Sequence, residues 1–272
     1  NGNITINGGT FVLSTGDDGI HADATVTVNG GDIDITRSYE GIESAVITLN
    51  DGNISVIASD DGINVAGGVD GSGGMPGPGR GRGGPGAAQG SETFTYTGDY
   101  YLYINGGTIV VDAAGDGLDA NGAIEMTGGV VVVNGPTESM NGALDYDGTF
   151  NISGGYFVAV GSAGMAQAPG AASTQNSVLL NLNGTLPGGT LVNIQNEVGE
   201  SLLTFAPSKE FQSITFSSPE LATGDYTLYY GGSVDGSSVD GLYTDATYST
   251  GTEYTGFTIS SVTTILGGGG FR

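Results

Sequence analysis

The chain has 272 residues, of which 53 are glycine, and its 5 basic and 29 acidic residues give a formal net charge of −24. So acidic a chain repels nucleic-acid phosphates and anionic membrane surfaces, which argues against nucleic-acid binding and makes divalent cations the natural counter-charge. Collagen is excluded because the glycines show no period of three and only 8 residues are proline, and no apolar stretch is long enough to insert into a membrane.

The first part of the chain contains three copies of one repeat. ITINGGTFVLSTGDDGIHAD begins at Ile4, VTVNGGDIDITRSYEGIESA begins at Val26, and ITLNDGNISVIASDDGINVA begins at Ile47. The spacing is 22 residues from Ile4 to Val26 and 21 from Val26 to Ile47. Each copy predicts a strand, an Asn-Gly-Gly or similar turn, a second strand, a polar bend and a short aliphatic third strand.

A segment rich in glycine and proline, GGVDGSGGMPGPGRGRGGPGAAQG, interrupts the repeats after residue 66. It has too little apolar surface to order itself, so we expect an exposed loop insertion over residues 67–98. Arg80 and Arg82, two of the five basic residues, lie in it.

Three more copies of the repeat follow, and they begin at Leu102, Ile124 and Phe150. Three short strands in a period of about 22 residues predict an all-β fold, a parallel β-helix in which each coil stacks on the one before. A leucine-rich repeat has a similar period, but its leucine and asparagine consensus is missing and no helical stretch is present. We therefore assign residues 1–182 to a solenoid.

In residues 183–272 the glycine-pair pattern fades and longer alternating strands appear, such as TGFTISSVTTIL at 255–266. They predict a C-terminal β segment, either further irregular coils or a cap on the end of the solenoid.

Alignment of the repeats on the third strand places acidic residues at the same two positions of successive coils. Asp18, Glu40, Asp61 and Asp116 come just before the aliphatic residue, and His21, Glu43, Asn64, Asp119 and Asp145 come just after it. Equivalent positions in stacked parallel strands lie about 4.8 Å apart. Two unit charges at about 5 Å repel by roughly 3 kcal/mol at an effective dielectric of 20, so this carboxylate column calls for a cation.

Calcium suits the column because its oxygen ligands lie at about 2.3–2.6 Å, so that one ion can bridge carboxylates of adjacent coils. Magnesium demands a tighter octahedron, and a chain with no cysteine and one histidine is a poor candidate for zinc or copper. The alternative is that Asp-Gly and Asp-Asp-Gly are ordinary turn sequences. His21, the only histidine, is expected to be a bystander.

In DYYLYINGG, strand alternation turns Leu102 and Ile104 inward and Tyr101 and Tyr103 outward. Such a tyrosine pair offers a platform on which pyranose rings can stack, and it is our candidate carbohydrate-binding pair. The other explanation is that the two rings cover the neighbouring insertion.

Several stretches resemble the bacterial carbohydrate-binding domain-containing β-helix proteins. They are the segment 115–169, which begins GDGLDANGAIEMTGG, the segment SYEGIESAVITLNDGNISVIASDDGINVAGG that begins at Ser38, the Gly-Pro insertion, and STQNSVLLN at 173–181. The resemblance implies a secreted right-handed β-helix, shaped like pectate lyases, that binds cellulose or polygalacturonic acid without cleaving it. It also implies calcium ions in the turns, held by members of one set: Asp17, Asp18, Glu40, Glu43, Asp60, Asp61, Asp116, Asp119 and Asp145.

We therefore expect an extracellular or cell-surface, calcium-dependent polysaccharide-binding protein with no catalytic residues, from which any export signal is absent or already removed. Two alternatives stay open. The open end of a solenoid exposes strand edges, so a calcium-stabilised filament built by head-to-tail stacking is the first. A polysaccharide lyase is the second, although Arg37 is the only basic residue on a repeat.

Overall fold

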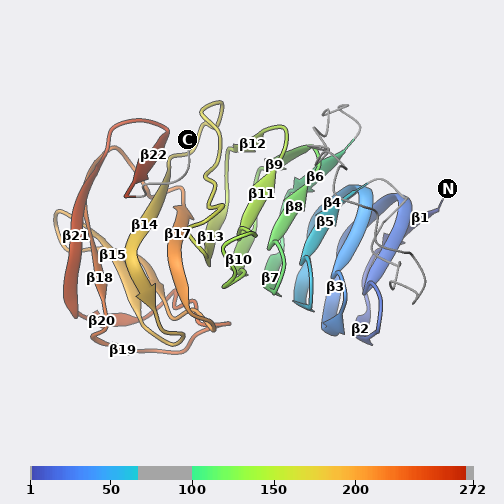
Figure 1. Cartoon of the computed structure of the whole chain (residues 1–272), viewed down its shortest axis with the longest axis horizontal. Helices are drawn as coiled ribbons and strands as arrows, with labels where there is room; N and C mark the ends of the chain where they lie inside the picture. Colours follow the sequence, from blue (N-terminus) through green and yellow to red (C-terminus); the bar gives the residue numbers. More distant parts are fainter. Residues whose placement is uncertain (1, 67–99, 268–272) are drawn as a thin grey trace, which may run out of the picture.

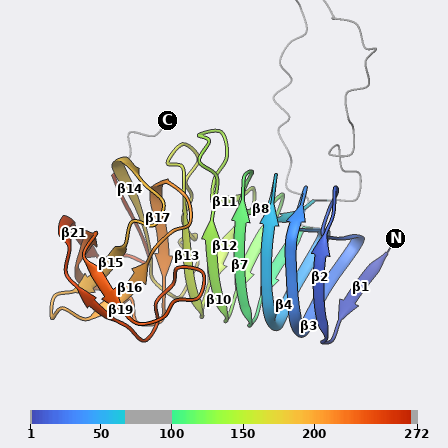
Figure 2. The same ribbon diagram turned by 90° about the horizontal axis from the view of Figure 1, so that it is seen from below.

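A computed structural model describes residues 2–66 and 100–267, and every regular element in these ranges is a β-strand. The chain forms a β-solenoid of about six turns with a spacing of about 22 residues, followed by a set of mostly antiparallel strands at its C-terminal end (Figures 1 and 2). The predicted all-β solenoid is thus confirmed. The predicted loop insertion, with Arg80 and Arg82, lies outside the described residues, and the described part contains no helix able to cross a membrane.

The solenoid has three faces, each a stack of parallel strands. Two long strands, β3 (Ile20–Ser38) and β4 (Ile42–Ala58), bend at the corners and contribute to all three faces. Face 1 also contains β1 (Asn3–Ile6), β6 (Tyr101–Ile104), β9 (Ala123–Met126) and β12 (Phe150–Ile152). Face 2 contains β2 (Thr10–Ser14), β7 (Thr108–Ala113), β10 (Val130–Asn134) and β13 (Tyr156–Gly161). Face 3 contains β5 (Ile63–Val65), β8 (Leu118–Ala120) and β11 (Leu144–Tyr146).

The strands pair in register, so that like residues stack on like. The column that runs along face 1 is Ile4, Val26, Ile47, Leu102, Ile124 and Phe150. Its members from Val26 onward are fully buried, and Leu102 and Ile104 have no exposed surface, as the alternation in DYYLYINGG predicts. Stacked aliphatic side chains of all three faces form one continuous core inside the solenoid.

The Asn-Gly-Gly turns stack in the same way. Side-chain amides of successive turns hydrogen-bond along the solenoid, with Asn29 donating to Asn7 at 2.8 Å, Asn50 to Asn29 at 2.7 Å and Asn105 to Asn50 at 2.8 Å. Thr127 continues the stack by donating its hydroxyl to Asn105 at 2.9 Å. The asparagines of successive coils therefore satisfy one another's side-chain amide groups at an exposed corner of the solenoid.

Packing explains why a glycine follows the acidic residue in the turn that precedes each strand of face 3. A Cβ atom on Gly41 would lie 2.2 Å from the Gly62 carbonyl oxygen and 2.2 Å from Cγ1 of Val56, and Gly19, Gly62 and Gly117 face comparable contacts. The chain crosses so close to the next coil that only hydrogen fits at these positions.

The C-terminal strands lie at the end of the solenoid that carries the last coil (Figure 1). They are β14 (Ser177–Leu186), β15 (Val192–Asn196), β16 (Ser201–Phe205), β17 (Phe211–Ser217), β18 (Gly224–Tyr230), β19 (Ser233–Asp235), β20 (Thr247–Ser249), β21 (Thr252–Ile259) and β22 (Thr263–Leu266). Strand β17 pairs antiparallel with β13, and β14 and β22 extend the same sheet beyond it. A separate sheet has the order β16-β15-β18-β21, and β14 crosses the expected boundary at residue 182.

A second core joins these strands to the outer surface of face 2. Val110, Val132 and Val158 occupy one outward-facing row of the late coils and belong to this core, with exposed fractions of 8%, 1% and 0%. The same row in the early coils is Val12, Asp34 and Ser55, and Val12 is 70% exposed. The C-terminal strands thus cover the late coils of face 2.

The glycine contacts give a direct test of coil spacing. We expect Gly41→Ala to lower the free energy of unfolding by about 1–3 kcal/mol, because the added methyl group must displace backbone as well as Val56. The measurement is denaturant unfolding followed by circular dichroism. Gly16→Ala is the matched control, since a Cβ there meets nothing within 4 Å, and an equal loss in both variants would contradict this account.

Candidate metal centre on face 3

The acidic column lies on the outer side of face 3 in the predicted order. Strand pairing sets His21 opposite Glu43, Glu43 opposite Asn64, Asn64 opposite Asp119, and Asp119 opposite Asp145. Backbone hydrogen bonds also hold the preceding turns of adjacent coils in register. The N–H groups of Gly19, Gly41 and Gly62 donate to the carbonyl groups of Glu40, Asp61 and Asp116. The coil-to-coil register was therefore predictable from the repeat, while the side-chain contacts divide the column into separate groups.

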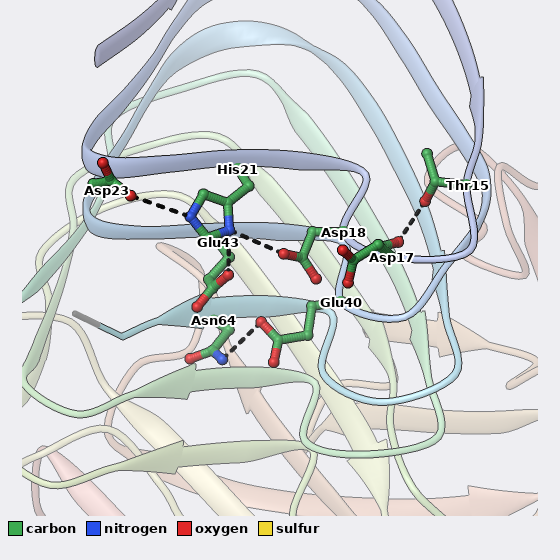
Figure 3. A network of polar contacts seen from close by, with 8 residues as sticks. All are labelled: Thr15, Asp17, Asp18, His21, Asp23, Glu40, Glu43 and Asn64. Carbon is green, nitrogen blue, oxygen red and sulfur yellow. Dashed lines mark hydrogen bonds and ion pairs between the residues drawn. The ribbon is translucent and has the colours of Figure 1, made fainter. Parts of the chain in front are cut away.

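The first group, cluster I, consists of Asp18, His21 and Glu43 from the first two coils (Figure 3). Nδ1 of His21 lies 2.9 Å from Oδ2 of Asp18 and 2.6 Å from Oε2 of Glu43. Side-chain exposure is 32% for His21, 6% for Asp18 and 1% for Glu43. The imidazole is therefore the solvent-facing member of a largely buried group.

The carboxylates around His21 favour its charged form. The hydrogen bond with Asp18 is the main reason that the pKa of His21 is raised, and the negative charges of Glu43 and Asp18 act in the same direction. Nε2 of the ring lies 3.7 Å from Oδ1 of Asp23 on the outer side. The only histidine, expected to be a bystander, thus lies among three carboxylates.

The second group, cluster II, consists of Asp61, Asp116 and Asp119 from the next two coils, with one oxygen of each within 4.8 Å of the others. Asp61 accepts the Asp116 backbone N–H at 2.6 Å, and Asp116 accepts that of Gly142 at 2.5 Å. Burial, reinforced by neighbouring carboxylates, raises the pKa to about 7 for Asp61, about 6 for Asp116 and about 8 for Asp119. The cluster holds negative charge that the described chain leaves poorly compensated.

The other predicted ligands lie outside the two clusters. Glu40 accepts a hydrogen bond from Asn64 at 2.9 Å, and its burial raises its pKa to about 7. Asp145 accepts one from Gln167 at 2.8 Å. The neutral side chains of Asn64 and Gln167 thus hydrogen-bond to the carboxylates of the column that belong to neither cluster.

Asp17 and Asp60, the first aspartates of the two Asp-Asp-Gly steps, have other contacts. The Asp17 carbonyl accepts the Thr15 hydroxyl and, at 3.0 Å, the Tyr39 N–H. A hydrogen bond to Asp60 raises the pKa of the Tyr39 hydroxyl to about 12. Neither contact is an aspartate side chain bonded to its own turn, because Asp17 acts through its backbone carbonyl and Asp60 through a tyrosine of the preceding coil.

The donor atoms distinguish the two clusters. Cluster II offers only carboxylate oxygens, which is the donor set that calcium prefers. Cluster I adds an imidazole nitrogen, which suits softer ions better. In the described part of the chain the basic side chains are Arg37, which lies on face 2, and Lys209, whose Nζ is 2.8 Å from Asp112 Oδ1.

The candidate sugar-stacking pair lies on face 1, beside the acidic face. The rings of Tyr101 and Tyr103 stack on one another with centroids 5.3 Å apart and an interplanar angle of 8°. Both are half-buried, and burial is the main cause of the raised pKa of Tyr103. Each ring therefore covers one face of the other.

Residues 1–81 match the family model described as carbohydrate-binding domain-containing protein. The match confirms the predicted resemblance for this part of the chain, and it indicates a polysaccharide partner and a binding role. It includes cluster I and Asp61, whereas Asp116 and Asp119 lie beyond it. Searches among curated proteins and among solved structures gave no significant match.

The raised pKa values predict an unusual pH dependence of stability in the presence of a chelator. Because cluster II, Glu40 and His21 all have raised pKa values, the folded state binds more protons than the unfolded state between about pH 4 and 8. The free energy of unfolding must then fall as pH rises through this window. We expect a melting temperature in EDTA several degrees higher at pH 5.5 than at pH 8.

Asp119→Asn is the control for this experiment, since it removes the carboxyl whose pKa is about 8 and should weaken the pH dependence. A melting temperature that falls on acidification of the unaltered protein would contradict the assignment.

Proposed function

We propose that the protein binds an acidic polysaccharide such as polygalacturonic acid through a calcium ion held by cluster II. The observation that carries the proposal is the convergence of Asp61, Asp116 and Asp119 within 4.8 Å on a partly exposed face, in a chain that begins with a match to a carbohydrate-binding family.

Electrostatics supports a cation between protein and ligand. A chain with a net charge of −24 repels a polymer of uronates, and no basic surface among the described residues of face 3 compensates for this. Calcium takes six to eight oxygen ligands, so three carboxylates that bind through one oxygen each leave positions for other oxygens. When bound, calcium would supply the positive charge to which a uronate carboxylate coordinates.

The protein's own residues would fix where the ion and the sugar sit. Asp61 and Asp116 are held by backbone N–H groups, so their free oxygens are pre-positioned, and Asp119 projects from β8 between buried Leu118 and Ala120. A rigid set of ligands loses little conformational freedom on binding, which favours affinity. An extracellular or cell-surface location is part of the proposal, because extracellular calcium sites of about 0.1–1 mM affinity suffice there.

Tyr101 and Tyr103 remain the candidate contact for a neutral glycan such as cellulose, through the ring surface that their mutual stacking leaves exposed. They lie on face 1 and cluster II lies on face 3, so a polymer that contacts both would have to cross the corner between these faces.

The alternatives receive less support. Strand β17 pairs with β13, so on face 2 the last coil does not offer an open edge to the first coil of another copy, and head-to-tail stacking of complete coils is disfavoured. A lyase needs a basic residue at the sugar, whereas Arg37 and Lys209, the described basic residues, lie away from face 3.

The test is the affinity for polygalacturonate in calcium and in EDTA. We expect EDTA to abolish binding and Asp119→Asn to weaken it by at least about tenfold, since a single lost charged ligand costs more than 1.4 kcal/mol. Asp235→Asn, an exposed carboxylate on β19, is the matched control and should bind normally.

Equal binding by Asp119→Asn and the unaltered protein, or binding that survives EDTA, would refute the proposal. Absorbance of unsaturated products should stay flat throughout, and an increase would instead identify a lyase.

A further inference from the structure

We propose that cluster I is a second metal site, formed by Asp18, His21 and Glu43, that takes a transition ion of the zinc class and rejects calcium. The inference is independent of polysaccharide binding at cluster II.

The geometry around His21 Nδ1 is the first observation. Carboxylate oxygens of Asp18 and Glu43 lie 2.9 and 2.6 Å from the same nitrogen, although that nitrogen carries at most one proton to share between them. A metal ion bonds to one nitrogen and two oxygens at once. Tetrahedral ligands at about 2.0–2.1 Å are about 3.3 Å apart, so the oxygens of Asp18 and Glu43 would need to move away from the nitrogen by about 0.4 and 0.7 Å.

Asp18 supplies the second observation. Its side chain is only 6% exposed, and its Oδ1 atom is buried without a hydrogen-bond partner. Figure 3 shows the carboxylate of Asp18 pointing toward His21 and Glu43, with Glu40 on the next coil below. Only the other oxygen, Oδ2, faces His21, so the buried carboxylate is incompletely satisfied, and a cation bound to it would offset part of the cost of burying its charge.

A carboxylate also lies on the other side of the ring, at ion-pair distance. Metal-binding histidines usually present the other ring nitrogen to a carboxylate or carbonyl group, which fixes the ring and makes it a better ligand. Here Nε2 faces Oδ1 of Asp23 at 3.7 Å (Figure 3). The ring is 32% exposed, so water can complete the coordination of the ion.

The donor set decides the choice of ion. One imidazole nitrogen and two carboxylates suit zinc and its neighbours, such as cobalt and nickel, whereas calcium binds oxygen almost exclusively. The all-oxygen cluster II has the opposite preference. The two clusters are therefore expected to load with different ions even when both ions are present.

The rival explanation is that protonated His21 is itself the cation and pairs with both carboxylates. Titration of the 272-residue chain with Zn²⁺ against a competing chelator, in saturating calcium, distinguishes the metal site from this ion pair. We expect one zinc ion to bind under these conditions. Co²⁺ in place of Zn²⁺ should give visible absorption bands that differ from those of the aqueous ion.

His21→Asn removes the nitrogen donor and should weaken zinc binding by at least about 30-fold, or about 2 kcal/mol. Asp119→Asn, in cluster II, is the matched control and should bind zinc normally. Calcium binding and the circular dichroism of His21→Asn should be unchanged, and Glu43→Gln provides a second variant if His21→Asn misfolds.

Absence of zinc binding, displacement of zinc by calcium, or equal zinc affinity in His21→Asn would overturn the second site and favour the ion-pair explanation. None of these outcomes affects the calcium-dependent affinity for polygalacturonate, so failure of this site and failure of the proposed function are distinguishable.

Discussion

The in-register stacking of parallel coils is the constraint on which the rest of the structure depends. Because each residue lies about 4.8 Å from its equivalents in the coils above and below, every position is repeated as a column. Apolar columns form the core, the asparagines of the turns exchange amide hydrogen bonds, and the glycines before face 3 allow the close approach of one coil to the next. The same rule forces carboxylates into contact.

The acidic column shows how a solenoid handles this repulsion. Part of the charge is separated by neutral amides, since Asn64 donates to Glu40 and Gln167 to Asp145. Part is offset by backbone N–H groups, as at Asp61. What remains gathers into two clusters with different donor atoms, which is why we assign them to different ions. In the absence of cations, burial and the repulsion between these carboxylates raise their pKa values.

The C-terminal strands determine which surfaces stay available. They extend the sheet of face 2 through β17 and bury the outward valines of the late coils. Face 3 takes no part in this packing and keeps cluster II partly exposed. This arrangement fits a binding protein in which face 2 packs against the C-terminal strands and face 3 presents carboxylate ligands for a metal ion.

The sequence alone determined the period, the strand alternation and the order of the acidic column, because these follow from a repeat whose copies occupy equivalent positions. The sequence also contains a signal for the covering of face 2: VVVVN at 130–134 is apolar on both faces, unlike DIDIT at 32–36, which indicates a strand covered on both sides. Only the tertiary structure decided which carboxylates converge, since the lengths and rotamers of Asp, Glu and Asn differ from coil to coil at equal backbone register. It likewise showed that the side chains of His21 and Glu43, whose stacking the repeat predicts, meet through Nδ1, and it placed β17 on β13, because side-chain conformations and pairings outside the repeat depend on how the whole chain packs.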